Sequence, residues 1–224
     1  MSRENLIWKF YGRFYDALLE LAPYKHLLST ICSSVNPKPG KRYLDAGCGT
    51  GNLTNEIKEH GAEIIGVDYS ESMLNKAQNK FKNIPFAFGD LNKKLEFDND
   101  HFDGIASNNV LAYVKDLNFT LREFHRVLKP GGKIVLATLK QGFSPLKIYL
   151  SHIREVGFLR ALKTFLPMIF VGLCNIIILQ SAGRGIYHLL TKEELEHALK
   201  ENGFKNIQIT NAYADQDLLA TCEK

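Results

Sequence analysis

The stretch Tyr43-Leu-Asp-Ala-Gly-Cys-Gly-Thr-Gly51 decides the fold, because a short apolar run ends in an acid and continues into glycines at alternate positions. The apolar part predicts a buried strand. The glycines permit positive φ angles and a close approach of the backbone to a bound molecule. Their spacing differs from the Gly-x-Gly-x-x-Gly of dinucleotide sites, and no Lys-Ser/Thr follows as in a phosphate-binding P-loop. We therefore expect a nucleoside derivative as ligand, with a plain tight turn as the alternative.

A second acid follows the next apolar run. Residues 62–67 predict another buried strand, which delivers Asp68 at its carboxyl end, about twenty residues after the glycines. A carboxylate there can accept charge-assisted hydrogen bonds from both hydroxyls of a ribose. The alternative is that Asp68 caps the helix expected from Glu71, but Ser70 is the better candidate for that cap. We therefore expect Asp68 to bind a ribose.

Strands and helices alternate from the glycines to about residue 140. The spacing of apolar residues predicts helices over 52–60, 71–82 and 117–128, and strands over 84–88, 102–107 and 133–138, the last preceded by a turn at 128–132. Such alternation implies right-handed crossovers and a parallel sheet covered on both faces. Ligands bind at the carboxyl ends of the strands in such sheets, which places Asp45, Asp68, Asp90 and Asn108 in one site.

The C-terminal part of the chain predicts an antiparallel end to this sheet. Thr191-Lys-Glu-Glu194 is a capping-box sequence that opens a helix to about Asn202. Residues 205–213 and 217–222 predict two strands whose very short connection forces an antiparallel hairpin. The expected fold class is therefore α/β: a doubly wound, mostly parallel, Rossmann-like sheet of seven strands with an antiparallel C-terminal strand and a helical lid insertion.

The same segments resemble the ordered motif series of a known family. In order and spacing, the sequences at 44–51, 66–74, 89–91, 102–103 and 128–133 look like those of the class I S-adenosylmethionine-dependent methyltransferases. The resemblance covers roughly residues 40–140. It implies S-adenosylmethionine as cofactor and S-adenosylhomocysteine as product.

The resemblance also implies roles for individual residues. The glycine loop would lie against the methionine part of the cofactor, and Asp68 would hold the ribose. Tyr69 and Met73 would flank the adenine, whose amino group Asp90 would bind. Residues 107–109 would face the sulfonium and the substrate. The cofactor-binding residues expected in this way are Asp45, Gly47, Cys48, Gly49, Asp68, Tyr69, Met73, Asp90, Leu91 and Asn108.

An N-terminal segment adds a further expectation. Tyr11-Gly-Arg-Phe-Tyr-Asp16 is similar to a cap in which a tyrosine closes over the cofactor, and this likeness adds Tyr15 to the cofactor-binding residues. The packing of an amphipathic helix would explain Tyr11 and Tyr15 almost as well.

Composition fits one domain that acts on a small molecule. The 224 residues suffice for a doubly wound domain, with an N-terminal helical cap (1–38), a cofactor-binding core (39–140), a lid insertion (141–186) and a C-terminal helix and hairpin (187–224). The net charge of +4 is mild and the basic residues are scattered, which disfavours nucleic acid as a partner. The four cysteines lack Cys-x-x-Cys spacing and no histidine cluster accompanies them, so neither a metal site nor disulfides are expected. No apolar signal region follows Arg3, and we expect a cytoplasmic protein.

The segment Gly142–Gly185 is not explained by the core. Its central part, residues 165–179, is almost entirely apolar but contains Pro167 and Asn175. A transmembrane helix needs ~20 apolar residues, more than this run provides. A buried helical pair that shields the site is the second interpretation. The third is an apolar lid that receives a greasy substrate or contacts a membrane peripherally. Interfacial helices carry basic residues beside an apolar stretch, and those here are Arg154, Arg160, Lys163 and Arg184.

The chemistry follows from the implied cofactor. Its sulfonium methyl is already activated, so the enzyme mainly aligns a nucleophile and excludes water, and such proximity can contribute ~7–11 kcal/mol. A general base would add ~10²–10⁴-fold. The candidates are Tyr113, His152 and His188, each of which can equally be a structural or surface residue.

We expect methyl transfer to a small, apolar acceptor such as a quinone, a lipid or an isoprenoid-derived molecule. Two alternatives stay open. One is a methyltransferase for RNA or protein, which would need a basic or aromatic surface beside the cleft. The other is a non-catalytic cofactor-binding module that regulates a partner. The sequence determines neither the acceptor, nor the methylated atom, nor the oligomeric state.

Overall fold

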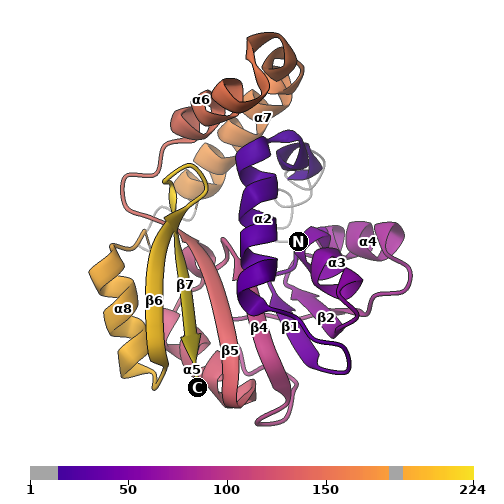
Figure 1. Cartoon of the computed structure of the whole chain (residues 1–224), viewed down its shortest axis with the longest axis vertical. Helices are drawn as coiled ribbons and strands as arrows, with labels where there is room; N and C mark the ends of the chain where they lie inside the picture. The colour runs from indigo at the N-terminus through magenta and orange to yellow at the C-terminus, as the bar shows by residue number, and fades with distance from the viewer. Residues whose placement is uncertain (1–14, 182–188) are drawn as a thin grey trace.

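One sheet organises the chain, in the strand order β3-β2-β1-β4-β5-β7-β6 (Figure 1). The structure is a computed structural model and describes residues 15–181 and 189–224. The strands are β1 Arg42–Ala46, β2 Glu63–Asp68, β3 Phe86–Phe88, β4 Phe102–Asn108, β5 Leu128–Leu139, β6 Lys205–Ala212 and β7 Asp217–Glu223. The first five are mutually parallel, whereas β7 runs antiparallel to β5 and β6. The expected α/β class, with its seven-stranded, mostly parallel sheet and antiparallel C-terminal strand, is confirmed.

Strand β5 differs from the expectation at its start. The sequence predicts a turn at 128–132 and a strand only from Lys133, but β5 begins at Leu128. Phe102 pairs with Leu128 and Gly104 pairs with Lys133, so the residues between Leu128 and Lys133 outnumber those opposite them on β4. The Pro-Gly-Gly sequence therefore forms a bulge inside the strand rather than a turn before it.

The helices follow the predicted periods, and two predicted caps are confirmed. Ser70 Oγ accepts a hydrogen bond from the Met73 backbone N–H at 3.4 Å. The capping box of Thr191 and Glu194 is formed in both directions, at 3.2 and 2.8 Å. The helices are η1 Asp16–Glu20, α2 Ala22–Val35, α3 Asn52–Glu59, α4 Glu71–Lys80, η2 Leu111–Tyr113, α5 Leu117–Val127, α6 Pro145–Val156, α7 Phe158–Ser181 and α8 Lys192–Glu201.

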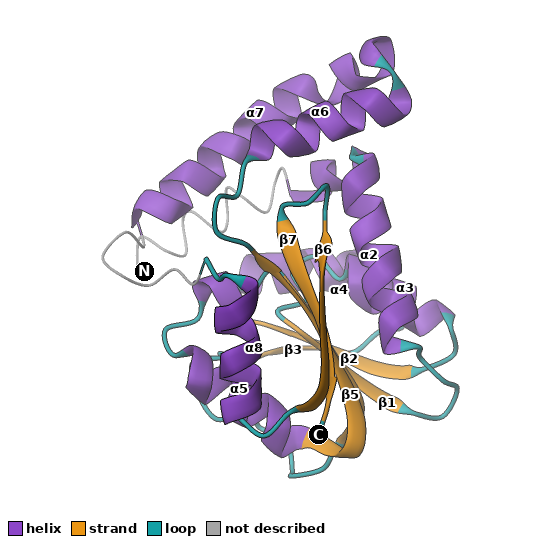
Figure 2. Cartoon of the chain, turned by 60° about the vertical axis from the view of Figure 1, so that its left-hand side comes forward, coloured by secondary structure: helices purple, strands orange, loops and turns teal. Residues whose placement is uncertain are grey.

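The sheet separates two hydrophobic cores, one on each face (Figure 2). Alternate residues of β5 divide between them: Val135 and Ala137 belong to the core beneath α2 and α3, while Ile134 and Leu136 belong to the core beneath α5 and α8. This alternation is the side-chain period of a strand buried on both faces. The two cores hold the sheet from both faces, and the carboxyl ends of its parallel strands remain available for a binding site.

Helices α6 and α7 form a hairpin that projects beyond the sheet, above the carboxyl ends of the parallel strands (Figure 2). The hairpin occupies the place of the expected lid insertion. Pro167 lies inside α7. In the part of the chain that the structure describes, no helix combines the length and apolar character that crossing a membrane requires.

Candidate active site

A cavity of about 280 Å³ opens at the carboxyl ends of β1, β2 and β4. The strand order reverses between β1 and β4, and such a switch point is where open α/β sheets bind ligands. The expected cofactor-binding residues line this cavity, with the exceptions of Asp45 and Cys48.

The glycine loop forms the floor of the cavity. The backbone N–H groups of Gly47 and Cys48 both donate to the Val67 carbonyl oxygen, at 2.8 and 2.9 Å, which ties the loop to β2. Gly47 has a φ of 80°, and a Cβ there would lie 2.2 Å from Val110 Cγ2. Only glycine fits this position, because any side chain would collide with Val110 and strain the backbone.

Asp68 lies at the end of β2 with both carboxylate oxygens engaged by the backbone. Its Oδ2 accepts from the Gly49 N–H and its Oδ1 accepts from the Ser70 N–H, each at 2.8 Å. Burial raises the pKa of Asp68, and these backbone N–H groups counteract that rise. Each oxygen keeps a lone pair, so the carboxylate can still accept two hydroxyl groups. Because Ser70 caps α4, Asp68 is not needed as the cap of that helix.

Asp90 closes the same end of the cavity. Its Oδ1 accepts from the backbone N–H and from the side-chain Nδ2 of Asn92, both at 3.0 Å. Tyr69 and Met73 also line this end. The Tyr69 ring packs against Phe88 with a centroid separation of 5.8 Å. Two carboxylates beside apolar side chains suit a ligand with hydroxyl and amino groups on flat rings.

A chain of hydroxyl and amide groups leads from Tyr15, which lies against Gly49, to Asn108 at the β4 end of the cavity. The hydroxyl groups of Tyr15 and Tyr24 lie 3.0 Å apart, and Asn108 Nδ2 donates to the Tyr24 oxygen at 3.4 Å. Burial raises the pKa of Tyr15 well above its usual range, so this phenol stays neutral. Asn108 Oδ1 is buried and accepts no hydrogen bond from the described residues.

Asn109 presents a second buried amide oxygen, like that of Asn108. The residue has a φ of 56°, and its Nδ2 donates to Asp217 Oδ2 at 2.8 Å. Its Oδ1 is buried and without a partner among the described residues. Burial raises the pKa of Asp217 to about 7, and the bond from Asn109 partly offsets that rise. A buried acceptor without a donor is costly, so two such oxygens beside a cavity indicate a ligand that donates hydrogen bonds.

The turn between β6 and β7 brings Tyr213 to this end. Tyr213, Ala214 and Asp215 have φ values of 50°, 54° and 64°, which residues other than glycine rarely adopt. The Gln216 side chain holds the turn, because its Nε2 donates to the carbonyl oxygens of Ala214 and Asp215 at 3.2 and 2.9 Å. The turn sets the Tyr213 ring against Tyr24, with centroids 5.9 Å apart. Strained backbone of this kind is common at functional sites.

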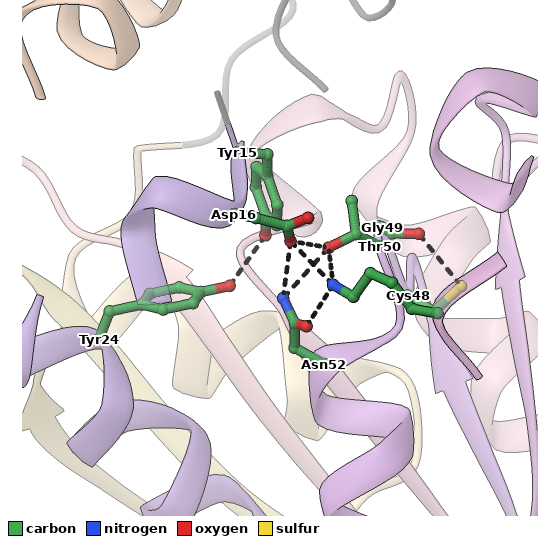
Figure 3. Close-up of polar contacts among 8 residues, drawn as sticks. Tyr15, Asp16, Tyr24, Cys48, Gly49, Thr50 and Asn52 are labelled. Atoms are coloured by element: carbon green, nitrogen blue, oxygen red, sulfur yellow. Dashed lines mark hydrogen bonds and ion pairs between the residues drawn. The ribbon is translucent and has the colours of Figure 1, made fainter. Parts of the chain in front are cut away.

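An ionic network fastens the N-terminal cap to the glycine loop (Figure 3). Asp16 Oδ1 accepts from Thr50 Oγ1 at 2.6 Å, from Lys80 Nζ at 2.9 Å and from Asn52 Nδ2 at 3.3 Å. Burial opposes the charge on Asp16, but the donors outweigh it and lower the pKa. The network holds Tyr15, the residue before Asp16, against Gly49.

Two expected cofactor residues point away from the cavity. Asp45 is fully buried and accepts from Thr54 Oγ1 at 2.6 Å, which fixes α3 against β1. Burial raises its pKa to about 7. The Cys48 side chain packs toward β2, since a Cβ on Gly66 would lie 2.9 Å from its Sγ. The structure therefore gives both side chains a supporting role behind the loop and not the predicted contact with a ligand.

The three candidate bases are placed differently. Tyr113 lines the cavity. His152 does not: it is buried on α6, and its Nδ1 accepts from the Ala22 N–H at 3.2 Å, which caps the start of α2. Burial lowers the pKa of His152. The ring satisfies the start of α2 and does not line the cavity, so the structure gives no support to the prediction of His152 as a base. His188 and Tyr11 lie outside the described residues.

Asn109 lines the cavity, within the stretch 107–109 that was expected to face the substrate. Tyr24, Phe143 and Tyr213 also line it and were not predicted individually, because each reaches the cavity only through the packing of distant elements.

Comparison with known proteins identifies this kind of site. Residues 37–203 match the family model described as a methyltransferase domain. A demethylmenaquinone methyltransferase of Staphylococcus saprophyticus is 33% identical over 156 residues, which cover 63% of this chain and 66% of the relative. A ubiquinone biosynthesis O-methyltransferase of Coxiella burnetii is 36% identical over 108 residues, 46% of each chain. The match thus spans about half to two thirds of the length of these curated relatives.

A solved structure agrees over nearly the whole chain. The S-adenosylmethionine dependent methyltransferase from Mesorhizobium loti superposes with a TM-score of 0.63 at 25% sequence identity, and the match covers 88% of this chain and 96% of that one.

Proposed function

The chain belongs to the class I S-adenosylmethionine-dependent methyltransferases, and we propose that it transfers the methyl group of this cofactor to a small, apolar, quinone-like acceptor. The observation that carries the proposal is the division of the cavity. One end, beyond β2 and β3, holds the carboxylates of Asp68 and Asp90, whereas the other, beyond β4, is walled by aromatic side chains around two amide oxygens that have no partner among the described residues.

The carboxylate end fits the nucleoside of S-adenosylmethionine. Asp68 keeps lone pairs for the two ribose hydroxyls, and Asp90 can accept from an exocyclic amino group. Tyr69 and Met73 offer apolar surface for a purine. The glycine loop gives close access to the backbone because Gly47 tolerates no Cβ. The residues present therefore fit this cofactor.

The aromatic end fits a flat acceptor with a hydroxyl group. Leu18, Leu139, Phe143 and Tyr213 supply the apolar and aromatic walls. The buried oxygens of Asn108 and Asn109 can accept a hydrogen bond from the acceptor and so orient it. Lys115 also lines the cavity, but the walls formed by these four residues carry no charge, which supports an apolar ring.

The proposed mechanism rests on alignment. When bound, S-adenosylmethionine supplies a methyl group activated by its sulfonium. Asn108 lies at the end of β4 and is positioned by its bond to Tyr24, and Asn109 is positioned by its bond to Asp217. Tyr113 lines the cavity and is the proposed base: as a phenolate, it would take the proton of the acceptor hydroxyl and become a neutral phenol.

The curated relatives support the acceptor class. Their names, demethylmenaquinone methyltransferase and ubiquinone biosynthesis O-methyltransferase, both refer to quinones. A methyltransferase for RNA or protein would need a basic surface beside its cleft. The apolar walls of this cavity favour a small molecule as acceptor instead.

The test is an incubation of the protein with methyl-labelled S-adenosylmethionine and a panel of acceptors. The panel holds a reduced demethylmenaquinone analogue with a short side chain, a hydroxylated benzoquinol, total RNA and a basic protein. We expect label in one of the quinols. Label confined to RNA or protein contradicts the proposed acceptor class. Binding of S-adenosylhomocysteine without labelling of any acceptor favours the non-catalytic alternative.

A further inference from the structure

The α6–α7 hairpin carries an apolar surface that neither core explains. On α7, five exposed residues repeat at intervals of three and four, which aligns them along one face of the helix. They are Leu159, Leu162, Leu166, Ile169 and Leu173. Leu159 is 79% exposed and Leu166 is 75% exposed, far more than is usual for leucine in a folded domain. We call these five residues the α7 stripe.

The α7 stripe is not the face by which the helix packs. Ala161 and Thr164 are buried, and the Tyr149 hydroxyl of α6 donates to the Ala161 carbonyl oxygen at 2.7 Å. The Tyr149 and Phe165 rings pack with centroids 5.8 Å apart. At 100° per residue, the centre of the stripe lies about a third of a turn from Ala161 and about half a turn from Thr164. The helix is thus held to the protein by one face while a second apolar face remains exposed.

Cations border the exposed apolar side chains. Arg160 and Lys163 follow Leu159 and Leu162 by one position each, so they lie along one edge of the stripe, and both are exposed. On α6, the exposed Leu146 and Leu150 have Lys147 beside them in the same way. The long aliphatic stems of these residues can lie on apolar surface while the charges reach outward.

The hairpin is also poor in acids. Glu155 is the one acidic residue between positions 145 and 181, and it faces His26 with a Nε2–Oε1 distance of 2.7 Å. Lys147, Arg154, Arg160 and Lys163 lie in the same range. A second copy of the hairpin would oppose like charges across the interface. A surface with anionic groups outside an apolar interior complements both the α7 stripe and the excess of cations.

We propose that the α6–α7 hairpin docks onto an anionic lipid bilayer, with the α7 stripe inserted between the acyl chains and its cations among the headgroups. An apolar face with a basic border is the pattern of helices that lie in a membrane interface. Phe143 and Ser144 connect the hairpin to the cavity: Phe143 lines it, and the Ser144 N–H donates to Gln216 Oε1 at 2.8 Å. If the proposed function holds, docking brings the cavity to an acceptor dissolved in lipid.

Co-sedimentation with vesicles tests the docking without cofactor or acceptor. The full chain is mixed with vesicles of phosphatidylcholine alone or of an equimolar mixture with phosphatidylglycerol. We expect binding to the mixed vesicles, weaker binding to phosphatidylcholine, and a decrease with salt because charges are screened over ~3 Å at 1 M ionic strength. Absence of binding to the mixed vesicles overturns the proposal, whatever the outcome of the labelling experiment.

Paired variants separate the two contributions. The variant Leu159→Gln/Leu166→Gln keeps good helix formers and should weaken binding to both vesicle types by about 100-fold, since each leucine loses its burial. The variant Arg160→Gln/Lys163→Gln should lose about 30-fold on the mixed vesicles only, at ~1 kcal/mol per cation. Its control, Arg122→Gln/Lys192→Gln, removes two exposed cations from α5 and α8 and should bind as the wild type does.

Sedimentation velocity without vesicles decides between lipid and a second copy. The lipid proposal predicts the same sedimentation coefficient for the wild type and the two leucine substitutions. The proposal is overturned if two results occur together: the wild type is a dimer that dissociates when the leucines are replaced, and the leucine variant binds vesicles as well as the wild type does. These results would assign the stripe to self-association. Circular dichroism of each variant confirms that the helices remain.

Discussion

Asn109 donates a hydrogen bond from its Nδ2 to Asp217 Oδ2 at 2.8 Å, across a separation of 108 positions in the chain. The bond joins the end of β4, where the cavity opens, to the start of the antiparallel strand β7. The Asn109 Oδ1 is buried, and the described residues offer it no donor. The C-terminal hairpin thus helps to build the part of the cavity to which we assign the acceptor.

Asp217 should make the stability of the protein depend on pH. Burial raises its pKa to about 7 in the folded state, against ~3.9 in an unfolded chain. Between these values the folded state holds a proton that the unfolded state has lost, so stability is full below about pH 4 and falls as the pH rises toward 7. One such group contributes a slope of about 1.4 kcal/mol per pH unit.

We therefore expect Asp217→Asn to flatten the decline in the free energy of unfolding between pH 4 and 7, measured by urea denaturation at several pH values. Asp45→Asn should remove a similar slope, because burial raises the pKa of Asp45 to about 7 as well. Parallel curves for the wild type and Asp217→Asn would show that the carboxyl is already ionised in this range.

Gly47→Ala should destabilise the protein more than Gly142→Ala does. Both glycines have a φ of 80°, but a Cβ on Gly47 meets Val110 at 2.2 Å, while one on Gly142 meets nothing within 4 Å. Backbone strain alone costs about 1–2 kcal/mol, and the collision adds about 1–3 kcal/mol. Urea denaturation of the two variants gives the difference directly. Equal losses would mean that Val110 moves aside freely, and the glycine would then be needed only for its φ.

Tyr113→Phe should lower kcat about 100-fold on a quinol acceptor, with binding of S-adenosylhomocysteine unchanged, because the phenolate of Tyr113 is the proposed proton acceptor. Tyr149→Phe is the matched control, since its hydroxyl bonds to the Ala161 carbonyl on the hairpin. Initial rates with methyl-labelled cofactor measure both. A Tyr113→Phe enzyme that retains kcat within a factor of about three makes Tyr113 a wall residue.

The sequence predicts the parts of the protein that depend on local pattern. The glycine loop, Asp68 and the Ser70 cap are set by neighbours along the chain, and their glycine, acid and hydroxyl signals all appear where expected. The antiparallel hairpin of β6 and β7 follows equally from its short connection.

The parts that could not be predicted depend on which way a side chain turns or on distant packing. Asp45 follows the same strand-end rule as Asp68, but its carboxylate faces Thr54 on α3. His152 fits a catalytic histidine by type, yet only the tertiary structure shows that its ring caps α2. Tyr213 and Asp217 reach the cavity region through the turn between β6 and β7, in which three successive residues have positive φ angles. None of the three is a glycine, so the sequence does not indicate this turn geometry.

The central claim is that the cavity binds S-adenosylmethionine through Asp68, and calorimetric titration with S-adenosylhomocysteine tests it most directly. We predict binding by the wild type and a loss of about 1.5–3 kcal/mol, roughly 10- to 150-fold in Kd, for Asp68→Ala, because the ribose loses a charged acceptor. Asp103→Ala serves as the control and should leave the affinity unchanged, because Asp103 lies near the start of β4 and the cavity lies at its carboxyl end. Equal affinity of the wild type and Asp68→Ala for S-adenosylhomocysteine, or tight binding of NAD with no response to S-adenosylhomocysteine, would contradict the account.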